Sequence, residues 1–132
     1  MHIQQVFKSV IWTDLKLDFL KSLDKASNKY IREAKKTKEA KQYIKKFGDF
    51  GRSFHSGTLL NDTDFWDLKR YINQKALEYL NHQGYDMSFY DLFFSELWVQ
   101  EFAKKGGGHH SAHIHWNQHV SGFYFLKCSE KT

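Results

Sequence analysis

Five of the eight histidines of this chain lie within eleven residues, between His109 and His119. Inside this stretch His113 and His115 are two residues apart, and residues with that spacing project from the same face of an extended strand. Their imidazoles can therefore share one ion, and neutral imidazole is a good ligand for iron, zinc, nickel and copper. We predict that His113 and His115 ligate a metal ion.

The polar residues around this pair have other predicted roles. His109 and His110 follow the glycines Gly106–Gly108, and we expect both side chains to be solvated in an exposed loop. His119 lies in a loop that can fold over the site, so it competes with His115 as the second ligand. Asn117 either orients a ligand imidazole or forms a turn.

Extended and helical segments would have to position these groups. Residues 90–102 are predicted to form a strand, with Leu92, Phe94, Glu96, Trp98 and Gln100 at alternating positions. Because Glu96 and Gln100 share a face with Trp98, we predict that this face lines a partly wet cavity. Further strands are predicted at 4–12, 111–116 and 121–128. Apolar spacing predicts a helix from 61 to 84 and, between 15 and 47, either two helices or one broken helix. Helices followed by strands indicate an α+β domain.

Length, hydropathy and charge restrict the class of protein. The 132 residues correspond to one domain, and no apolar run approaches the roughly 20 residues of a membrane-spanning helix. The single cysteine, Cys128, fits a reducing cytosol. Twelve of the 20 Lys and Arg residues lie in the first 50 positions. No aromatic residue separates Arg32 from Tyr43, so we expect a solvated basic face and no nucleic-acid partner.

From Trp98 onward the sequence is similar to a known family. The similar features are the tryptophan, the glycine loop, His113-Ile114-His115 and the run Ser121–Leu126 (SGFYFL). In these features the chain resembles the 2-oxoglutarate–Fe(II) oxygenase family of phage and marine bacteria. The resemblance extends more weakly upstream and covers roughly residues 48–128.

The resemblance implies a fold and a chemistry. The fold is a double-stranded β-helix, a jelly-roll barrel whose sheet is braced by helices. The family site holds Fe(II) with two histidines and one carboxylate, and it leaves positions open for 2-oxoglutarate and O₂. His113 matches the first histidine, whereas His115 stands where the carboxylate is usual. Tyr124 inside the barrel would either contact the co-substrate or pack, so Asn117 and Tyr124 are the candidate cofactor-binding residues.

The resemblance also implies that parts of the oxygenase lie outside this chain. The family's distal histidine and its basic residue for 2-oxoglutarate would lie beyond Thr132. We therefore expect one domain over residues 1–132, with a basic helical segment at 1–50 and the start of the jelly-roll core at 85–132. This incomplete barrel would be inactive alone and could self-associate through its open sheet edge.

Two other functions remain open. Gly107, His113, His115 and His119 approach the first metal-binding motif of cupins, although His119 replaces the expected glutamate. A noncatalytic protein that interacts through its basic N-terminal segment is the other alternative. In each case we expect a cytoplasmic protein, in the host cytoplasm where a phage encodes it, and no membrane contact. The resemblance favours a small-molecule co-substrate, and the substrate itself is not indicated.

Overall fold

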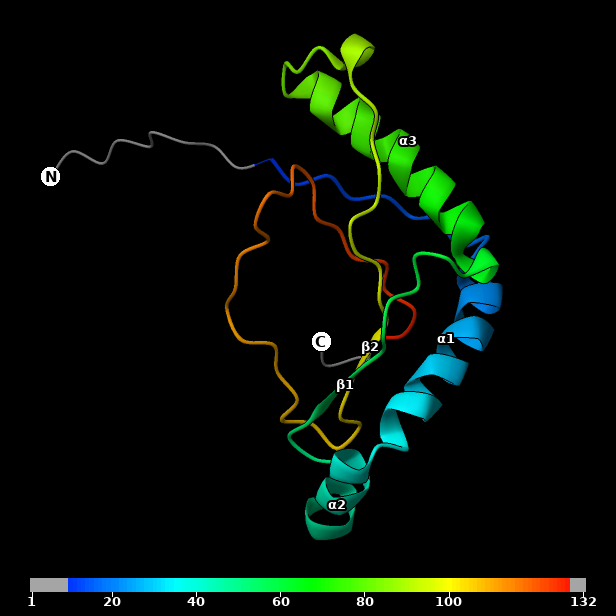
Figure 1. Ribbon diagram of the computed structural model, residues 1–132, viewed down its shortest axis with the longest axis vertical. Helices are drawn as coiled ribbons and strands as arrows, with labels where there is room; N and C mark the ends of the chain where they lie inside the picture. Colours follow the sequence, from blue (N-terminus) through cyan, green and yellow to red (C-terminus); the bar gives the residue numbers. More distant parts are fainter. Residues whose placement is uncertain (1–9, 129–132) are drawn as a thin grey trace, which may run out of the picture.

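The computed structural model describes residues 10–128 of the chain. Within this range the chain forms helices joined to one small sheet (Figure 1). The elements are α1 (Leu20–Lys35), α2 (Lys38–Phe47), β1 (Ser53–His55), the 3₁₀ turn η1 (Thr63–Phe65), α3 (Trp66–His82), the 3₁₀ turn η2 (Met87–Phe89) and β2 (Gln100–Phe102). The fold is therefore mostly helical.

The first two helices are separated by a short break. Helix α1 ends at Lys35, and the hydroxyl of Thr37 then accepts a hydrogen bond from the backbone N–H of Ala40 at 3.2 Å. This contact satisfies one of the free N–H groups in the first turn of α2. Helix α2 ends at Phe47, where Gly48 follows. The prediction of a helical region interrupted near its middle is confirmed.

Helix α3 follows the sequence prediction closely. The carboxylate of Asp62 accepts a hydrogen bond from the N–H of Asp64 at 2.8 Å, which starts the 3₁₀ turn that leads into the helix. The helix ends at His82, two residues before Gly84. Its apolar stripe faces inward, because Leu68 and Leu80 are buried there. The predicted helix at 61–84 is therefore confirmed, with the caps nearly where expected.

The sheet is an antiparallel ribbon of two strands. Ser53, Phe54 and His55 of β1 lie opposite Phe102, Glu101 and Gln100 of β2. Backbone hydrogen bonds outside the two regular strands extend this pairing on both sides. They join Ser56 N–H to the Val99 carbonyl at 3.0 Å, Leu59 N–H to the Leu97 carbonyl at 2.8 Å and Ala103 N–H to the Arg52 carbonyl at 2.9 Å. Segments 52–59 and 97–103 thus form one long irregular hairpin-like pair.

Two small apolar cores hold the helices on this ribbon. The larger core lies between α1, η1 and α3, and its buried members are Leu23, Ala26, Leu59, Phe65 and Leu68. The smaller core joins α1 and α2 to the strand β1 and consists of Ile31, Ala40 and Phe54. Val99 packs against both cores and therefore links them. Burying one face of the ribbon matters because an isolated two-stranded sheet is marginally stable in water.

The predicted double-stranded β-helix is wrong. In the described part of the chain the sheet has two strands, and the expected jelly-roll core at 85–132 contains three residues of strand, Gln100–Phe102. The predicted strands at 111–116 and 121–128 carry no ladder, since within residues 109–128 the backbone hydrogen bond formed is Gln118 N–H to the His115 carbonyl. Strands require a paired neighbour for their N–H and C=O groups. The alternation of side chains in these segments suggested strands, but it does not provide the neighbouring strand that a ladder needs.

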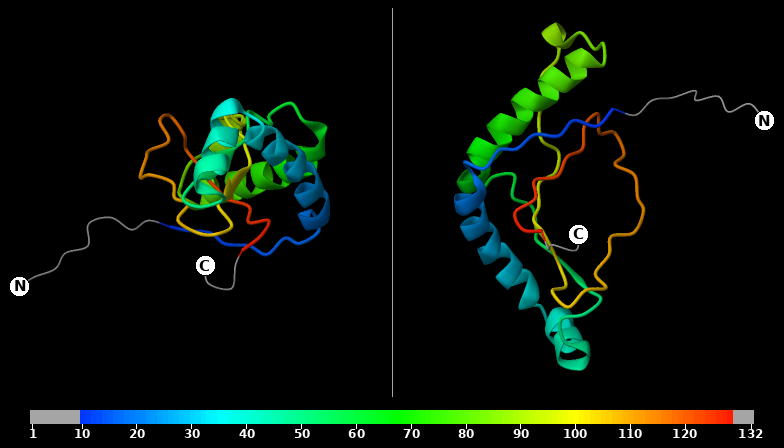
Figure 2. Two further views of the ribbon diagram at one scale, coloured as in Figure 1. Left: turned by 90° about the horizontal axis from the view of Figure 1, so that it is seen from below. Right: turned by 180° about the vertical axis from the view of Figure 1, so that it is seen from behind.

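The remaining extended prediction, at 4–12, falls mostly outside the described residues, and 10–12 form no regular element. Helices α1 and α3 lie along one side of the molecule, and the segment that carries the histidines forms an open loop on the other side (Figures 1 and 2). No helix among residues 10–128 is both long enough and apolar enough to cross a membrane.

Candidate metal centre

The two predicted ligands meet, although no strand holds them. The Nε2 atoms of His113 and His115 are 3.2 Å apart, and the ring planes are inclined by 67°. With metal–nitrogen bonds of about 2.0–2.1 Å, two nitrogens at this separation subtend an angle of about 100° at a shared ion. That angle suits neighbouring positions in tetrahedral or octahedral coordination.

A backbone contact determines which nitrogen of His113 is free. Its Nδ1 lies 2.8 Å from the carbonyl oxygen of Ser111, and a carbonyl can only accept a hydrogen bond. In the neutral ring the proton therefore lies on Nδ1, and the lone pair of Nε2 points toward His115. Metal-binding histidines commonly have this arrangement, in which the outer N–H is held by a carbonyl or carboxylate.

A layer of aromatic rings supports His115 from the side of the ribbon. The indole of Trp98, just before β2, stacks on His115 at 6.3 Å between ring centroids and on His55 of β1 at 5.1 Å. His55 reaches Trp98 because it pairs with Gln100, so the two rings are diagonal neighbours on one face of the ribbon. The half-buried position of His115 follows from this packing.

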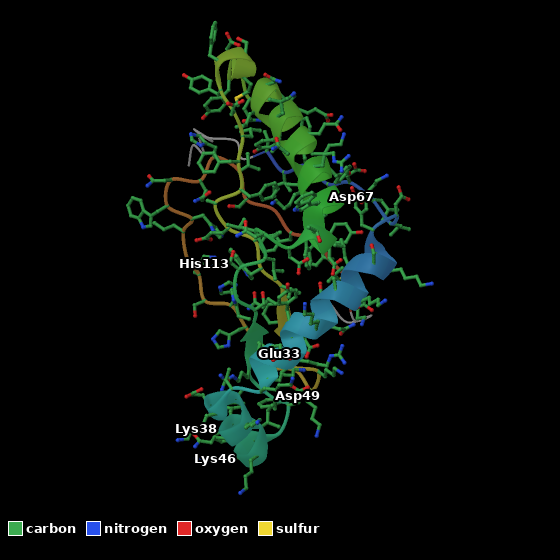
Figure 3. All side chains as sticks on the ribbon, turned by 45° about the vertical axis from the view of Figure 1, so that its right-hand side comes forward. Glu33, Lys38, Lys46, Asp49, Asp67 and His113 are labelled. Atoms are coloured by element: carbon green, nitrogen blue, oxygen red, sulfur yellow. The ribbon has the colours of Figure 1, made fainter. Side chains whose placement is uncertain are left out.

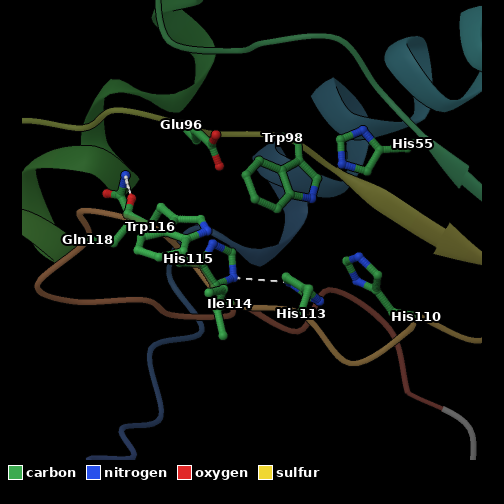
Figure 4. A pocket seen from close by; sticks show the side chains of 9 residues that line it. All are labelled: His55, Glu96, Trp98, His110, His113, Ile114, His115, Trp116 and Gln118. Atoms are coloured by element: carbon green, nitrogen blue, oxygen red, sulfur yellow. Dashed lines mark hydrogen bonds between the residues drawn. The ribbon is translucent and has the colours of Figure 1, made fainter.

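These groups surround an open cavity of about 350 Å³ (Figure 4). Its lining residues are His55, Glu96, Trp98, His110, His113, Ile114, His115, Trp116 and Gln118. With neutral histidines, Glu96 is the charged side chain in this lining, so the local field favours a cation. The prediction that Glu96 and Trp98 face a partly wet cavity is confirmed, whereas Gln100 does not line it.

His110 occupies a different place from the one expected. Its ring stacks on His113 with 4.3 Å between centroids and an inclination of 25°, so it forms part of the cavity wall and is not simply a solvated loop residue. His109 contributes through its backbone, since its carbonyl accepts a hydrogen bond from the Ser53 hydroxyl at 3.1 Å. His119 lies edge-on against Tyr85, outside the cavity lining.

The candidate cofactor-binding residues are not brought to the histidines. Tyr124 packs against the larger apolar core, and its hydroxyl donates to the backbone carbonyl of Lys16. Asn117 has a positive φ of 57°, which is the geometry of a turn. Neither side chain lines the cavity. The turn alternative for Asn117 and the packing alternative for Tyr124 are the ones that this arrangement favours.

The glycines before the histidine segment approach backbone and not the cavity. Gly107 has a φ of +75°, and a Cβ there would lie 3.0 Å from the Phe50 ring. A Cβ at Gly108 would lie 3.0 Å from the backbone nitrogen of Ala103. A side chain at either position would therefore force its neighbours to shift by a few tenths of an ångström, and at Gly107 the positive φ adds backbone strain. These contacts set the direction in which the histidine segment leaves β2.

The cavity fits a metal ion better than it fits 2-oxoglutarate. Two imidazoles are placed for one ion, although no group of three His, Cys, Asp or Glu side chains among residues 10–128 is arranged to hold it. Among residues 10–128, no Lys or Arg lines the cavity, so the described walls offer no cation for the carboxylates of 2-oxoglutarate. The binding of that co-substrate therefore stays an expectation from the resemblance alone.

Sequence reasoning identified the histidine pair but missed His55 and the wall position of His110. Both depend on which segments pair across the ribbon, and the sequence carries no local signal for the partner of β1. Comparison of the chain with protein families, with curated proteins and with solved structures gives no match. The function is therefore argued from the geometry of this site.

Proposed function

We propose that this protein binds a divalent transition-metal ion through His113 and His115. The observation that carries the proposal is the 3.2 Å separation of the two Nε2 atoms, together with the contact from His113 Nδ1 to the Ser111 carbonyl. The resemblance of the segment to iron oxygenases supports Fe(II) as the first ion to test. Imidazole ligands would accept zinc, nickel or copper as well.

The residues around the pair have separate roles in this proposal. The Ser111 carbonyl holds the proton of His113 on Nδ1 and keeps Nε2 available for coordination. Trp98 restricts the rotation of His115 by stacking on it. Glu96 attracts cations into the cavity. A bound ion of this kind supplies Lewis acidity and, as iron, redox chemistry with O₂.

Two protein ligands leave several coordination positions open. Such a centre can bind water or a small anionic ligand in the cavity, next to the indoles of Trp98 and Trp116. Open positions are characteristic of catalytic metal sites, whereas structural sites are closed by four protein ligands. The proposal therefore favours a reactive or exchangeable ion over a structural one.

Titration calorimetry with Fe(II) under anaerobic conditions, and with Co(II) as a spectroscopic probe, tests the proposal. We expect one ion per chain, and His113→Ala or His115→Ala should each lower the affinity at least about tenfold, because loss of even an outer-shell partner has that effect. His109→Ala is the matched control, since it removes an imidazole from the same segment whose ring does not line the cavity.

Two further variants separate ligands from neighbours. His110→Ala removes a stacked ring and should change the affinity less than His113→Ala, and Glu96→Gln should weaken binding modestly and only at low salt. Wild-type affinity in His113→Ala would show that the ligand assignment is wrong. Equal losses in all four histidine variants would indicate nonspecific binding to a histidine-rich segment.

A further inference from the structure

Helix α1 and its C-cap residue Lys36 carry five cations on one narrow side. At 3.6 residues per turn, these positions fall within about 80° of arc and extend over about 22 Å of helix. The five residues are Lys21, Lys25, Lys29, Arg32 and Lys36. All five are exposed, whereas the buried residues Leu23, Ala26 and Ile31 lie on the opposite side. We call these five residues the α1 basic stripe.

Little negative charge from the protein neutralises the α1 basic stripe. Among the described residues, Lys36 pairs with Glu33 at 2.7 Å, and the other four members form no ion pair. The remaining charges of the helix are paired elsewhere: Lys35 binds Glu101 of β2, and Asp24 binds Lys127. Lys35 and Asp24 are thus engaged with other parts of the fold, whereas the cations of the α1 basic stripe are exposed to water.

A groove runs along the stripe. It has a volume of about 490 Å³ and is lined by Ser22, Lys25, Ala26, Lys29, Arg32 and Asp64. Three cations therefore converge on one hollow, and Asp64 from η1 is the one carboxylate that residues 10–128 place on its wall. The hydroxyl of Ser22 faces the same space but is engaged with the Phe19 carbonyl at 3.0 Å.

Helix α2 continues the positive surface. Its cations Lys38, Lys41 and Lys45 lie within about 60° of arc on an exposed side. Figure 3 shows Lys38 and Lys46 projecting from this helix, with Glu33 at the end of α1 nearby. Between residues 20 and 47 there are ten Lys and Arg residues and three Asp and Glu residues. Each of the two helices therefore has an exposed basic side.

We propose that the α1 basic stripe binds the phosphate backbone of double-stranded nucleic acid. Rows of Lys and Arg on one helix side are the electrostatic pattern of such binding, and displacement of counterions from a duplex drives it. Among the described residues, the lining of the groove along the stripe includes no aromatic ring on which unpaired bases could stack, which disfavours single strands. The apolar residue in the described lining is Ala26, which is too small to insert into lipid, and this disfavours a membrane.

The proposed contact is sequence-independent. The stripe consists of four lysines and one arginine on a solvent-facing helix, and such contacts position a protein on the duplex without reading its bases. The sequence prediction of a solvated face considered stacking aromatics, which a duplex does not require. The alignment of five cations opposite the buried side, with one ion pair among them, is what the structure adds.

The test is the salt dependence of binding to a fluorescein-labelled 20-base-pair DNA duplex, measured by fluorescence anisotropy. Five phosphate contacts predict a loss of about 500-fold in affinity between 50 and 200 mM salt. Lys25→Gln/Lys29→Gln should reduce that loss to about 40-fold, because two contacts disappear. The matched control, Lys104→Gln/Lys105→Gln, makes the same charge change at two exposed residues after β2 and should keep the wild-type salt dependence.

Removal of a negative charge from the groove, in place of positive charges, gives a second test. Asp64→Asn removes the carboxylate from the groove and should strengthen duplex binding about threefold at low salt, whereas Asp91→Asn, beyond α3, should not. Equal salt slopes for the two lysine double variants would overturn the proposal. Tighter binding to vesicles containing phosphatidylserine or to polyglutamate, with the same dependence on Lys25 and Lys29, would overturn it in favour of a membrane or an acidic protein.

Discussion

Two regions of this molecule, residues 20–82 and residues 103–128, differ in what holds their structure together. From residue 20 to residue 82, the helices pack their apolar sides around Leu23, Leu59 and Phe65, each at most 3% exposed. From residue 103 to residue 128 the chain has no regular element, and Trp116 and Phe123 are 77% and 81% exposed. The helical half is therefore specified by burial, whereas the histidine half is specified by a few side-chain contacts.

The candidate metal centre lies where these two halves meet. Trp98 and His55 belong to the ribbon that packs on the helices, and His113 and His115 belong to the irregular half. Contacts that attach this half include Ser53 Oγ to the His109 carbonyl and Ser95 Oγ to Gln118 at 2.7 Å. A site at such a boundary has one wall on the ribbon, which packs against the helices, and one wall on a segment without regular structure.

The largest expected effect contrasts a buried residue with an exposed one. Leu59→Ala, at a position 1% exposed, should lower the free energy of unfolding by about 2–5 kcal/mol. Ile114→Ala, at a position 68% exposed, should change it by less than about 0.5 kcal/mol. Urea unfolding followed by circular dichroism measures both. A comparable loss in Ile114→Ala would mean that the histidine half carries a core of its own.

Metal addition should reduce the contrast between the halves. An ion at 100 times its dissociation constant stabilises the state that binds it by about 2.7 kcal/mol. Amide hydrogen exchange within residues 109–118 should therefore slow by up to about 100-fold on addition of Zn(II) or Fe(II), with little change in α3. A chelator should restore the original rates. Slowing in α3 alone would contradict a site at His113 and His115.

Helix capping gives a smaller effect confined to the helical half. Thr37→Ala removes the hydroxyl that accepts the hydrogen bond from the Ala40 N–H, and it should cost about 1 kcal/mol of unfolding free energy. Thr37→Ser retains the acceptor and serves as the control. Affinity for metal should stay at the wild-type value in both variants. A change in metal affinity would show that the two halves are coupled through α2.

The smallest effect concerns a hydrogen bond with a pH dependence. The Tyr30 hydroxyl donates to Asp62, and this contact lowers the pKa of the Asp62 carboxyl below its usual value of 3.8. A lowered carboxyl pKa contributes stability above the unfolded-state pKa, and that stability is lost as pH falls through the folded pKa. Tyr30→Phe should thus cost about 0.5–1 kcal/mol at pH 7 and less near pH 2.

Nuclear magnetic resonance titration of the Asp62 carboxyl carbon provides the direct measurement for this variant. In Tyr30→Phe the pKa of Asp62 should rise toward its usual value, because the largest cause of its shift is removed. The hydrogen bond from the Asp64 N–H remains and should hold part of the shift. An unchanged pKa would show that Tyr30 does not contact Asp62 in solution.

The sequence predicted what depends on local signals. Apolar spacing, Asp62 and Gly84 located α3, and the loss of the apolar stripe near Lys36 located the break between α1 and α2. These signals depend on residues close in sequence, so the helices they predict do not depend on how the rest of the chain folds. The close approach of His113 and His115 was also predicted, although an irregular segment and not a strand produces it.

The sheet could not be predicted in this way. A short motif that resembles the jelly-roll oxygenases does not indicate which segments form ladders, and within residues 10–128 β1 pairs with β2 alone. The position of His55 beside Trp98 follows from that long-range pairing, as does the stacked wall that supports His115. Such pairings join residues more than forty positions apart, where periodicity carries no information.

The close approach of Gly107 and Gly108 to the ribbon has a consequence for how this chain can vary over evolutionary time. Gly107 is exposed and Gly108 is half-buried, yet a methyl group at either would come within 3.0 Å of the Phe50 ring or of the backbone nitrogen of Ala103. Substitutions there would leave both apolar cores intact but would force this loop and its neighbours to shift. Neutral drift can therefore replace the exposed aromatic residues of the histidine half far more freely than these two glycines. Because they have no side chain, the two glycines allow the loop to lie close to its neighbours just before the histidines.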